Sequence, residues 1–237
     1  MSTSALVLLS AGLDSTVGLA LAQEAGITIR RALCFDYGQK AAKMEKERAL
    51  ALAEHYQIPL QIIDLPWLGA ITHTALSAHS ETELPDVGLE ELDNIARVTL
   101  ASAHKVWVPN RNGLLINIAG AFADSAGDAL ILTGFNAEEA ATFPDNTPQF
   151  SQAITRSLAF STEVQPQVIS YVQALNKIEI FQQALRLHVP LHLLWSCYRQ
   201  GPKHCGHCES CSRLWRAAAA NAQSALIEAH FEEIPHA

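Results

Sequence analysis

The chain has 237 residues, of which 49% are hydrophobic and 17% charged, and its formal net charge is −8. This length and apolar content suffice for a sizeable core, which favours one α/β domain with an appendage over a disordered chain or two full domains. The acidic balance leaves no broad basic face for many phosphates, so we expect no nucleic-acid partner.

Apolar runs alternate with helix-like segments along much of the chain, at a spacing that predicts βαβ crossovers. The fold class expected from this pattern is α/β, a doubly wound parallel sheet with helices on both faces. The predicted strands are 5–9, 28–35, 60–64, 129–133 and 167–171. The predicted helices are 16–23, 40–56, 113–126, 150–161 and one that begins near residue 176. Such sheets bind ligands at the carboxyl ends of their strands.

A turn of small residues, Ser10-Ala11-Gly12-Leu13-Asp14-Ser15, joins the first predicted strand to the first predicted helix. Free N–H groups and the helix dipole at such a junction favour a phosphate, and two serine hydroxyls add donors. The turn has neither the lysine of a Walker loop nor the spacing of GxGxxG. We expect an anion site here, with an ordinary βα connection as the alternative.

The periodicity breaks down between about residues 65 and 105, where prolines and glycines are scattered among polar residues. A stretch of this length inside a compact domain predicts a functional insertion or lid. The segment Val108-Pro109-Asn110-Arg111-Asn112 then leads into a helix and suits an anion or a planar heterocycle. Its alternative reading is a helix N-cap with a surface arginine.

The end of the chain carries the sharpest metal signal. Cys197, Cys205, Cys208 and Cys211 form C-x7-C-x2-C-x2-C, with short spacings typical of a zinc knuckle. Four thiolates leave no open coordination position, so one structural Zn²⁺ is expected, with an iron–sulfur cluster as the rival. Clustered cysteines suit a reducing compartment, and the sequence has neither a signal peptide nor an apolar run of about 18 residues, so we expect a cytoplasmic protein without membrane association.

Together these motifs resemble a known family in both content and order. The loop at Ser10 is similar to the SGGxDS loop of the PP-loop ATP pyrophosphatases, which release AMP and pyrophosphate. With the Phe35-Asp36-Tyr37-Gly38-Gln39 stretch, the Val108–Asn112 segment, Phe143-Pro144-Asp145, Lys177 and the four cysteines, the chain resembles the 7-cyano-7-deazaguanine (preQ0) synthases, the QueC/ExsB family.

This resemblance implies a PP-loop domain at 1–190 with an insertion at about 65–105, and a zinc-binding segment at 191–237. It implies Asp14, Ser15 and Lys177 as catalytic residues and Asn110, Arg111, Asn136, Phe143 and Asp145 as substrate-binding residues. It implies an ATP site formed by Leu9, Ser10, Ala11, Gly12, Leu13, Asp14, Ser15, Thr16, Val17, Gly18, Leu19, Phe35, Gln39 and Gly134.

The activity that the resemblance implies joins ammonia to 7-carboxy-7-deazaguanine, with two ATP and Mg²⁺, and gives the nitrile for queuosine synthesis. A homodimer is expected. Two alternatives are a tRNA-modifying PP-loop enzyme with an iron–sulfur cluster and a non-catalytic nucleotide- and zinc-binding module.

Two positions depart from the family pattern. Ala11 replaces the second glycine of the loop, where a positive φ would cost about 1 kcal/mol or more, so we expect either a negative φ at Ala11 or weakened nucleotide binding. The segment 141–147 lacks the arginine of a Ser-Gly-Tyr-Pro-Asp-Cys-Arg loop, so Arg111 or Arg156 is a candidate for binding the substrate carboxylate.

Overall fold

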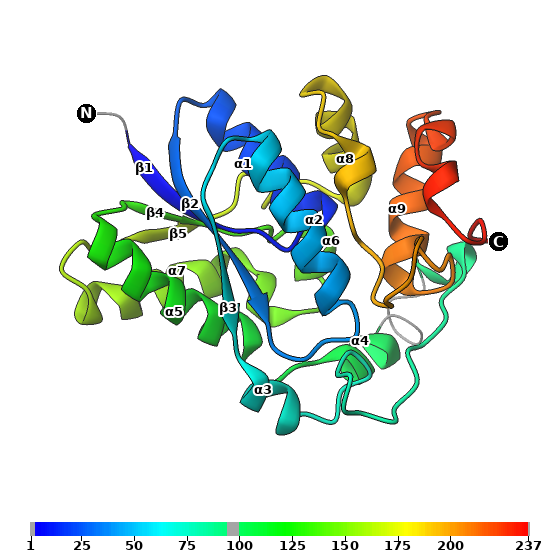
Figure 1. Cartoon of the computed structure of the whole chain (residues 1–237), viewed down its shortest axis with the longest axis horizontal. Coiled ribbons are helices and arrows are strands. Elements are labelled where there is room, and N and C mark those ends of the chain that lie inside the picture. The colour runs from blue at the N-terminus through cyan, green and yellow to red at the C-terminus, as the bar shows by residue number, and fades with distance from the viewer. Residues whose placement is uncertain (1–2, 94–99, 237) are drawn as a thin grey trace.

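The computed structural model describes residues 3–93 and 100–236. Its centre is a five-stranded parallel sheet in the order β3-β2-β1-β4-β5 (Figure 1). The strands are β1 Ser4–Leu8, β2 Thr28–Asp36, β3 Leu60–Asp64, β4 Leu130–Leu132 and β5 Gln167–Ile169. The helices are α1 Leu13–Glu24, α2 Ala42–His55, α3 Pro66–Ala70, α4 Leu100–Val106, α5 Arg111–Ala126, α6 Ala137–Ala140, α7 Pro148–Ser161, α8 Lys177–Arg186 and α9 Glu209–Ala220.

The predicted α/β class is confirmed, and each predicted strand matches an observed one to within two residues. The first helix begins at residue 13 rather than 16. Gly12 is its N-cap, with an extended backbone (φ −70°, ψ 164°), so the three residues after it are already helical. Much of the predicted phosphate turn is therefore the first turn of α1.

Both faces of the sheet are covered, because successive side chains of a strand point to opposite faces. Val7 of β1 packs in a core cluster with residues of α1 and α8, whereas Leu6 packs in a second cluster with residues of α5 and α7. Figure 1 shows these two pairs of helices on opposite sides of the sheet. The predicted doubly wound arrangement follows from this alternation.

The strand order reverses between β1 and β4, which both emerge toward the same edge of the sheet. The loop after β1 leads into α1, and the loop after β4 leads into α6. In open α/β sheets ligands bind at such a point, outside the carboxyl ends of the strands. The fold thus brings the two loops singled out in the sequence to one place.

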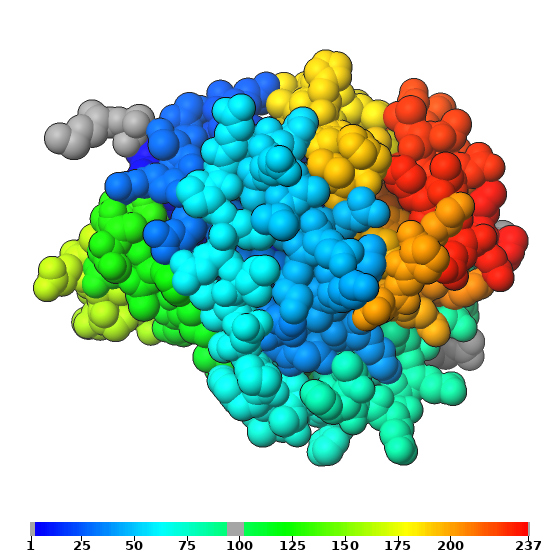
Figure 2. All heavy atoms as spheres, in the orientation of Figure 1, coloured from blue at the N-terminus to red at the C-terminus, as the bar shows by residue number. Residues whose placement is uncertain are grey.

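The insertion and the four-cysteine segment, residues 195–213, pack against one another. The N–H of Val87 donates to the carbonyl of His207 (2.9 Å), and Ser212 Oγ donates to the carbonyl of Val87 (2.6 Å). Figure 2 shows the C-terminal part of the chain lying beside α2 on this face of the molecule. Residues 94–99, part of the predicted insertion, lie outside the described residues. None of the described helices is both long and apolar enough to span a bilayer.

Candidate active site

The loop between β1 and α1 has the architecture of an anion cradle. The N–H groups of Leu13, Asp14 and Ser15 belong to the first turn of α1, where no helical carbonyl precedes them. The hydroxyls of Ser10 and Ser15 lie 3.2 Å apart, and Ser15 Oγ donates to the carbonyl of Gly12 (3.3 Å). Donors and helix dipole therefore converge at one point.

Glycine is required at the neighbouring strand end. A Cβ at Gly134, two residues after β4, would lie 2.9 Å from the backbone N of Ser15. Such a contact would force the strand end away from the helix N-terminus, so the absence of a side chain at residue 134 preserves the cradle.

Ala11 adopts the left-handed conformation, with φ 62°. The position therefore has the backbone geometry that glycine adopts freely, and an alanine there carries a strain of about 1–2 kcal/mol. The Ala11 side chain is fully buried, and its carbonyl accepts a hydrogen bond from the N–H of Trp195 (2.9 Å). Of the two outcomes left open by the sequence, the one with a negative φ is wrong.

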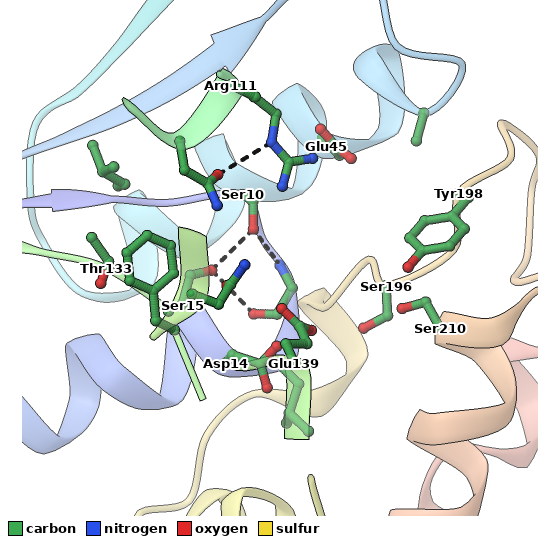
Figure 3. Close-up of a pocket in the computed structure, with 18 of the residues that line it drawn as sticks. Ser10, Asp14, Ser15, Glu45, Arg111, Thr133, Glu139, Ser196, Tyr198 and Ser210 are labelled. Atoms are coloured by element: carbon green, nitrogen blue, oxygen red, sulfur yellow. Dashed lines mark hydrogen bonds between the residues drawn. The ribbon is translucent and has the colours of Figure 1, made fainter. Parts of the chain in front are cut away.

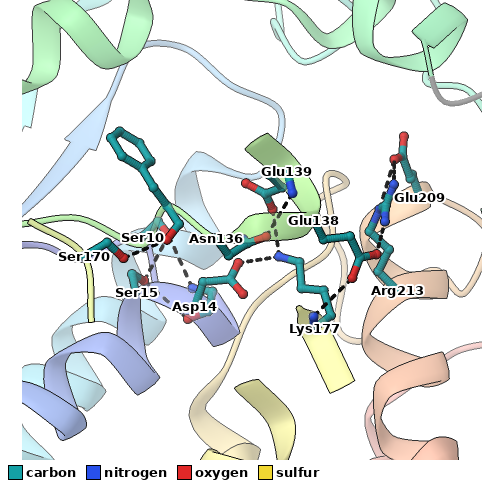
Figure 4. A network of polar contacts seen from close by, with 12 residues as sticks. Ser10, Asp14, Ser15, Asn136, Glu138, Glu139, Ser170, Lys177, Glu209 and Arg213 are labelled. Carbon is teal, nitrogen blue, oxygen red and sulfur yellow. Dashed lines mark hydrogen bonds and ion pairs between the residues drawn. The ribbon is translucent and has the colours of Figure 1, made fainter. Parts of the chain in front are cut away.

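An ion cluster around the buried side chain of Lys177 lies beside this loop (Figure 4). Lys177, the first residue of α8, donates through Nζ to Asp14 and to Glu139 (2.7 Å). A capping box of Asn176 and Glu179 fixes the start of this helix. The lysine thereby joins α8 to the first turn of α1.

Burial and charge compete in this cluster. Burial raises the pKa of Asp14 to about 6, although Lys177 acts against that shift. Burial alone would lower the pKa of Lys177, but its two carboxylate partners outweigh burial and raise it. Asp14 Oδ1 is buried and without a partner among the described residues, which suits a carboxylate oxygen that can bind a cation.

A cavity of about 290 Å³ opens over the loop, between the two strand ends and the four-cysteine segment (Figure 3). It is lined by many of the residues expected from the sequence. These are Leu9, Ser10, Gly12, Leu13, Asp14, Ser15, Phe35, Gln39, Arg111, Gly134, Phe143 and Lys177.

Other expected residues do not line the cavity. Ala11, Thr16, Val17, Gly18 and Leu19 are buried in or beneath the loop. Asn136 is fully buried and caps α6 by accepting from the N–H of Glu139 (2.9 Å). Asn110 is the exposed N-cap of α5. Asp145 is half-buried and accepts from the side chain of Asn146 (3.2 Å). Their predicted substrate contacts stay predictions.

Arg111 and Glu45 form a polar corner of the cavity, with the guanidinium and the carboxyl group side by side in Figure 3. Arg111 donates to Asn112 Oδ1 (3.2 Å) and to the hydroxyl of Tyr37 (3.5 Å), and it forms no ion pair with any described residue. Glu45 accepts from Gln39 Nε2 (2.6 Å). The guanidinium is thus positioned by neutral groups, as a binding site for an incoming anion requires.

The four cysteines form one buried cluster, with all sulfur atoms within 4.8 Å of one another. Two of them, Cys205 and Cys211, have sulfurs 3.9 Å apart. Tetrahedral zinc with Zn–S bonds of about 2.3 Å requires sulfurs separated by about 3.8 Å. Gly206 adopts φ 83°, and a Cβ there would lie 1.9 Å from the carbonyl oxygen of Glu233. The donor set and its spacing therefore fit one metal ion.

The same segment forms a wall of the cavity. Residues that flank the cysteines in sequence line it, namely Trp195, Ser196, Tyr198, Glu209, Ser210 and Arg213. Sequence reasoning missed these residues together with Glu45 and Glu139. The adjacency of Ser196 and Tyr198 to Cys197 was visible in the sequence, but nothing there indicated that the metal segment returns to the phosphate loop.

Comparison with known proteins extends the match to nearly the whole chain. The family model described as "Queuosine biosynthesis protein QueC" matches residues 4–222. A 7-cyano-7-deazaguanine synthase from Pelotomaculum thermopropionicum is 51% identical over 213 residues, covering 90% of this chain and 95% of that protein. One from Desulforamulus reducens is 48% identical over 214 residues, covering 90% and 92%. One from Methanosarcina mazei is 46% identical over 215 residues, with the same coverage.

These matches confirm the resemblance drawn from the separate motifs. They include the phosphate loop, Arg111, Lys177 and the four cysteines in a single alignment span. The chain belongs to the QueC family.

Proposed function

We propose that this protein is an ATP-dependent enzyme that converts 7-carboxy-7-deazaguanine and ammonia into 7-cyano-7-deazaguanine. The observation that carries the proposal is the cavity in which the N-terminus of α1, Lys177 and the guanidinium of Arg111 face one space. One end of that space suits the phosphates of ATP, and the other suits the carboxylate of the substrate.

The chemistry needs activation of a poor electrophile. A carboxylate oxygen of the substrate attacks the α-phosphorus of ATP, the bond to the β-phosphate oxygen breaks, and pyrophosphate leaves. Ammonia then attacks the acyl carbon, AMP leaves with the former carboxylate oxygen, and a proton is lost to give the amide. The amide oxygen then attacks the α-phosphorus of a second ATP and releases a second pyrophosphate, and loss of AMP and of both protons on the nitrogen leaves the nitrile.

The residues of the chain act mainly by positioning and charge stabilisation. In this proposal the N–H groups at the start of α1 and the Lys177 ammonium stabilise the charge on the phosphates. Asp14, whose second oxygen has no partner within residues 3–93 and 100–236, would hold the Mg²⁺ that neutralises pyrophosphate. Arg111 would bind the substrate carboxylate, and the aromatic ring of Phe143 would contact the deazaguanine plane.

The decisive experiment incubates the purified protein with ATP, Mg²⁺, ammonium and 7-carboxy-7-deazaguanine. AMP, pyrophosphate and the nitrile are expected by phosphorus NMR and mass spectrometry. Formation of ADP and orthophosphate instead would exclude the PP-loop assignment.

A matched pair of variants tests the carboxylate site. Arg111→Met should lower kcat/KM for the deazaguanine by about 10- to 150-fold, because a charge-assisted hydrogen bond in a desolvated site is lost. Arg156→Met removes an exposed arginine on α7, the other candidate raised by the sequence, and should have little effect. A large loss for Arg156→Met and little loss for Arg111→Met would instead assign carboxylate binding to Arg156.

We further propose that the four cysteines hold one structural Zn²⁺ per chain. Elemental analysis of aerobically and anaerobically prepared protein should give one zinc and no sulfide. Iron with stoichiometric sulfide would instead favour the tRNA-modifying alternative. The homodimer and the cytoplasmic location stay predictions, and light scattering checks the first.

A further inference from the structure

We propose that Arg213 is a positioning residue, which fixes Lys177 from the four-cysteine segment through the carboxylate of Glu138. The inference rests on the proposed function in one respect, which is that Lys177 takes part in the reaction. The contacts that support it run from α9 through α6 to α8.

The starting point is the anchoring of α9. This helix begins directly after Cys208 and contains Cys211 in its first turn, so two of the four clustered thiols fix its N-terminal end. Arg213 lies on the following turn and is only 8% exposed. Its guanidinium donates through Nε (3.0 Å) and through a terminal nitrogen (2.7 Å) to Glu209 Oε1, which fixes its direction.

The free end of this guanidinium donates to Glu138 Oε1, an oxygen that also accepts from Arg216 (2.7 Å). The other oxygen of Glu138 accepts from the backbone N–H of Lys177 (3.1 Å). One carboxylate therefore bridges α9 and the first residue of α8, as Figure 4 shows.

The neighbouring residue of α6 completes the arrangement. Glu139 binds the side chain of Lys177, while Glu138 binds its backbone. Two adjacent carboxylates thus determine both the position of the lysine Cα and the direction of its ammonium toward Asp14. The side chain of Glu138 is only 16% exposed, and its pairing with Arg213 and Arg216 offsets the charge of the second carboxylate beside it.

Arg213 also lines the cavity, so direct contact with a substrate is the competing explanation. The two explanations differ in how losses combine. If Arg213 acts through Glu138, then removing both groups should lower kcat no further than removing the more important of the two. If Arg213 binds a substrate by itself, the two losses should multiply.

The test is a double-mutant cycle of Arg213→Met and Glu138→Gln. Turnover to AMP is measured at saturating substrates, and the Kd for Mg·ATP is measured by calorimetry. Each single variant should lose about 10- to 100-fold in kcat, the scale of a small misplacement of a catalytic group. The double variant should lie within about threefold of the worse single variant.

Arg186→Met is the matched control for Arg213→Met, because it makes the same substitution at another ion-paired arginine. Arg186 is on the same helix as Lys177 and pairs with Glu24 of α1, but both side chains are 47% exposed. Its variant should keep wild-type turnover. Metal content and thermal unfolding are measured for every variant, and Arg213→Lys, with an intermediate loss, replaces the methionine variant if that one does not fold.

Three outcomes would overturn the inference: multiplicative losses in the cycle, a KM effect without a kcat effect, or full activity of Arg213→Met. A wild-type protein that forms no AMP would instead overturn the proposed function. In that case the double-mutant cycle is evaluated with the Kd for Mg·ATP in place of kcat. The double variant should then bind about as weakly as the worse single variant, and multiplicative losses of affinity would overturn the inference.

Discussion

Glu45 gives the structure a pH-dependent stability that one substitution should remove. Its carboxylate faces the cavity, and burial raises its pKa from 4.5 to about 7 against the opposing effects of Gln39 and Arg111, with Asp36 adding to the rise. The folded state therefore keeps a proton that the unfolded state releases between about pH 4.5 and 7. In that window the free energy of unfolding falls as the pH rises.

The size of the effect follows from the rise in the pKa of Glu45 from 4.5 to about 7, which at about 1.4 kcal/mol per pH unit corresponds to about 3 kcal/mol. Contact of the carboxylate with water in the cavity reduces this figure to roughly 2 kcal/mol. Glu45→Gln keeps the size of the side chain and an oxygen that accepts the hydrogen bond from Gln39, but its amide does not titrate. Relative to wild type, the variant should thus gain roughly 2 kcal/mol of stability between pH 4.5 and 7.5.

Urea unfolding of both proteins at four pH values across this range measures the difference. Taking the difference cancels the titration of groups that both proteins share, such as Asp14. Glu47→Gln, which changes an exposed carboxylate on the same helix, is the control and should have a small effect at every pH. A difference between Glu45→Gln and wild type that stays constant with pH would refute the reasoning.

Three further substitutions test the site. Lys177→Met should lower the free energy of unfolding by about 3 kcal/mol, because two half-buried carboxylates lose their cation, and should abolish AMP formation. Unchanged urea unfolding would contradict this. Cys208→Ser should give a metal-poor protein with a lower melting temperature, measured by elemental analysis and calorimetry, and a stable but inactive variant would be the contrary result. Phe143→Ala should raise KM for the deazaguanine about 10-fold at an unchanged KM for ATP. Equal changes in both constants would place Phe143 outside the substrate site.

The sheet and the phosphate loop could be predicted because their signals are local. The apolar run at residues 5–9 defines β1 whatever surrounds it, and the small residues after β1 bring their own hydrogen-bonding groups. Element ends were less predictable. The start of α1 depends on the extended backbone of Gly12, and α6 is a single turn that is too short to show a period.

The polar network could not be predicted, because its partners are far apart in sequence. Lys177 and Asp14 are separated by 163 positions, and Arg213 and Glu138 by 75. A glutamate on a helix such as Glu45 has the same appearance in sequence whether it faces solvent or a cavity. Only packing decides which carboxylates are buried, and therefore which pKa values shift.

At Ala11 the strain of a left-handed backbone is partly offset by burial of the side chain. Its left-handed backbone costs about 1–2 kcal/mol, yet its buried methyl group contributes about 0.8 kcal/mol. Replacement by glycine relieves the strain but loses the methyl contacts and makes the unfolded chain more flexible. The net change in stability for Ala11→Gly should thus stay within about 1 kcal/mol of zero.

Ala11→Val should behave differently, since a β-branched residue in this conformation adds a further strain of about 1–3 kcal/mol. The loop would relax away from positive φ and lose the hydrogen bond from the N–H of Trp195, which lies two residues before Cys197. Calorimetric titration with Mg·ATP should show weaker binding for the valine variant and nearly unchanged binding for the glycine variant. Equal affinity in both variants would mean that the left-handed geometry at residue 11 is unnecessary for the phosphate site.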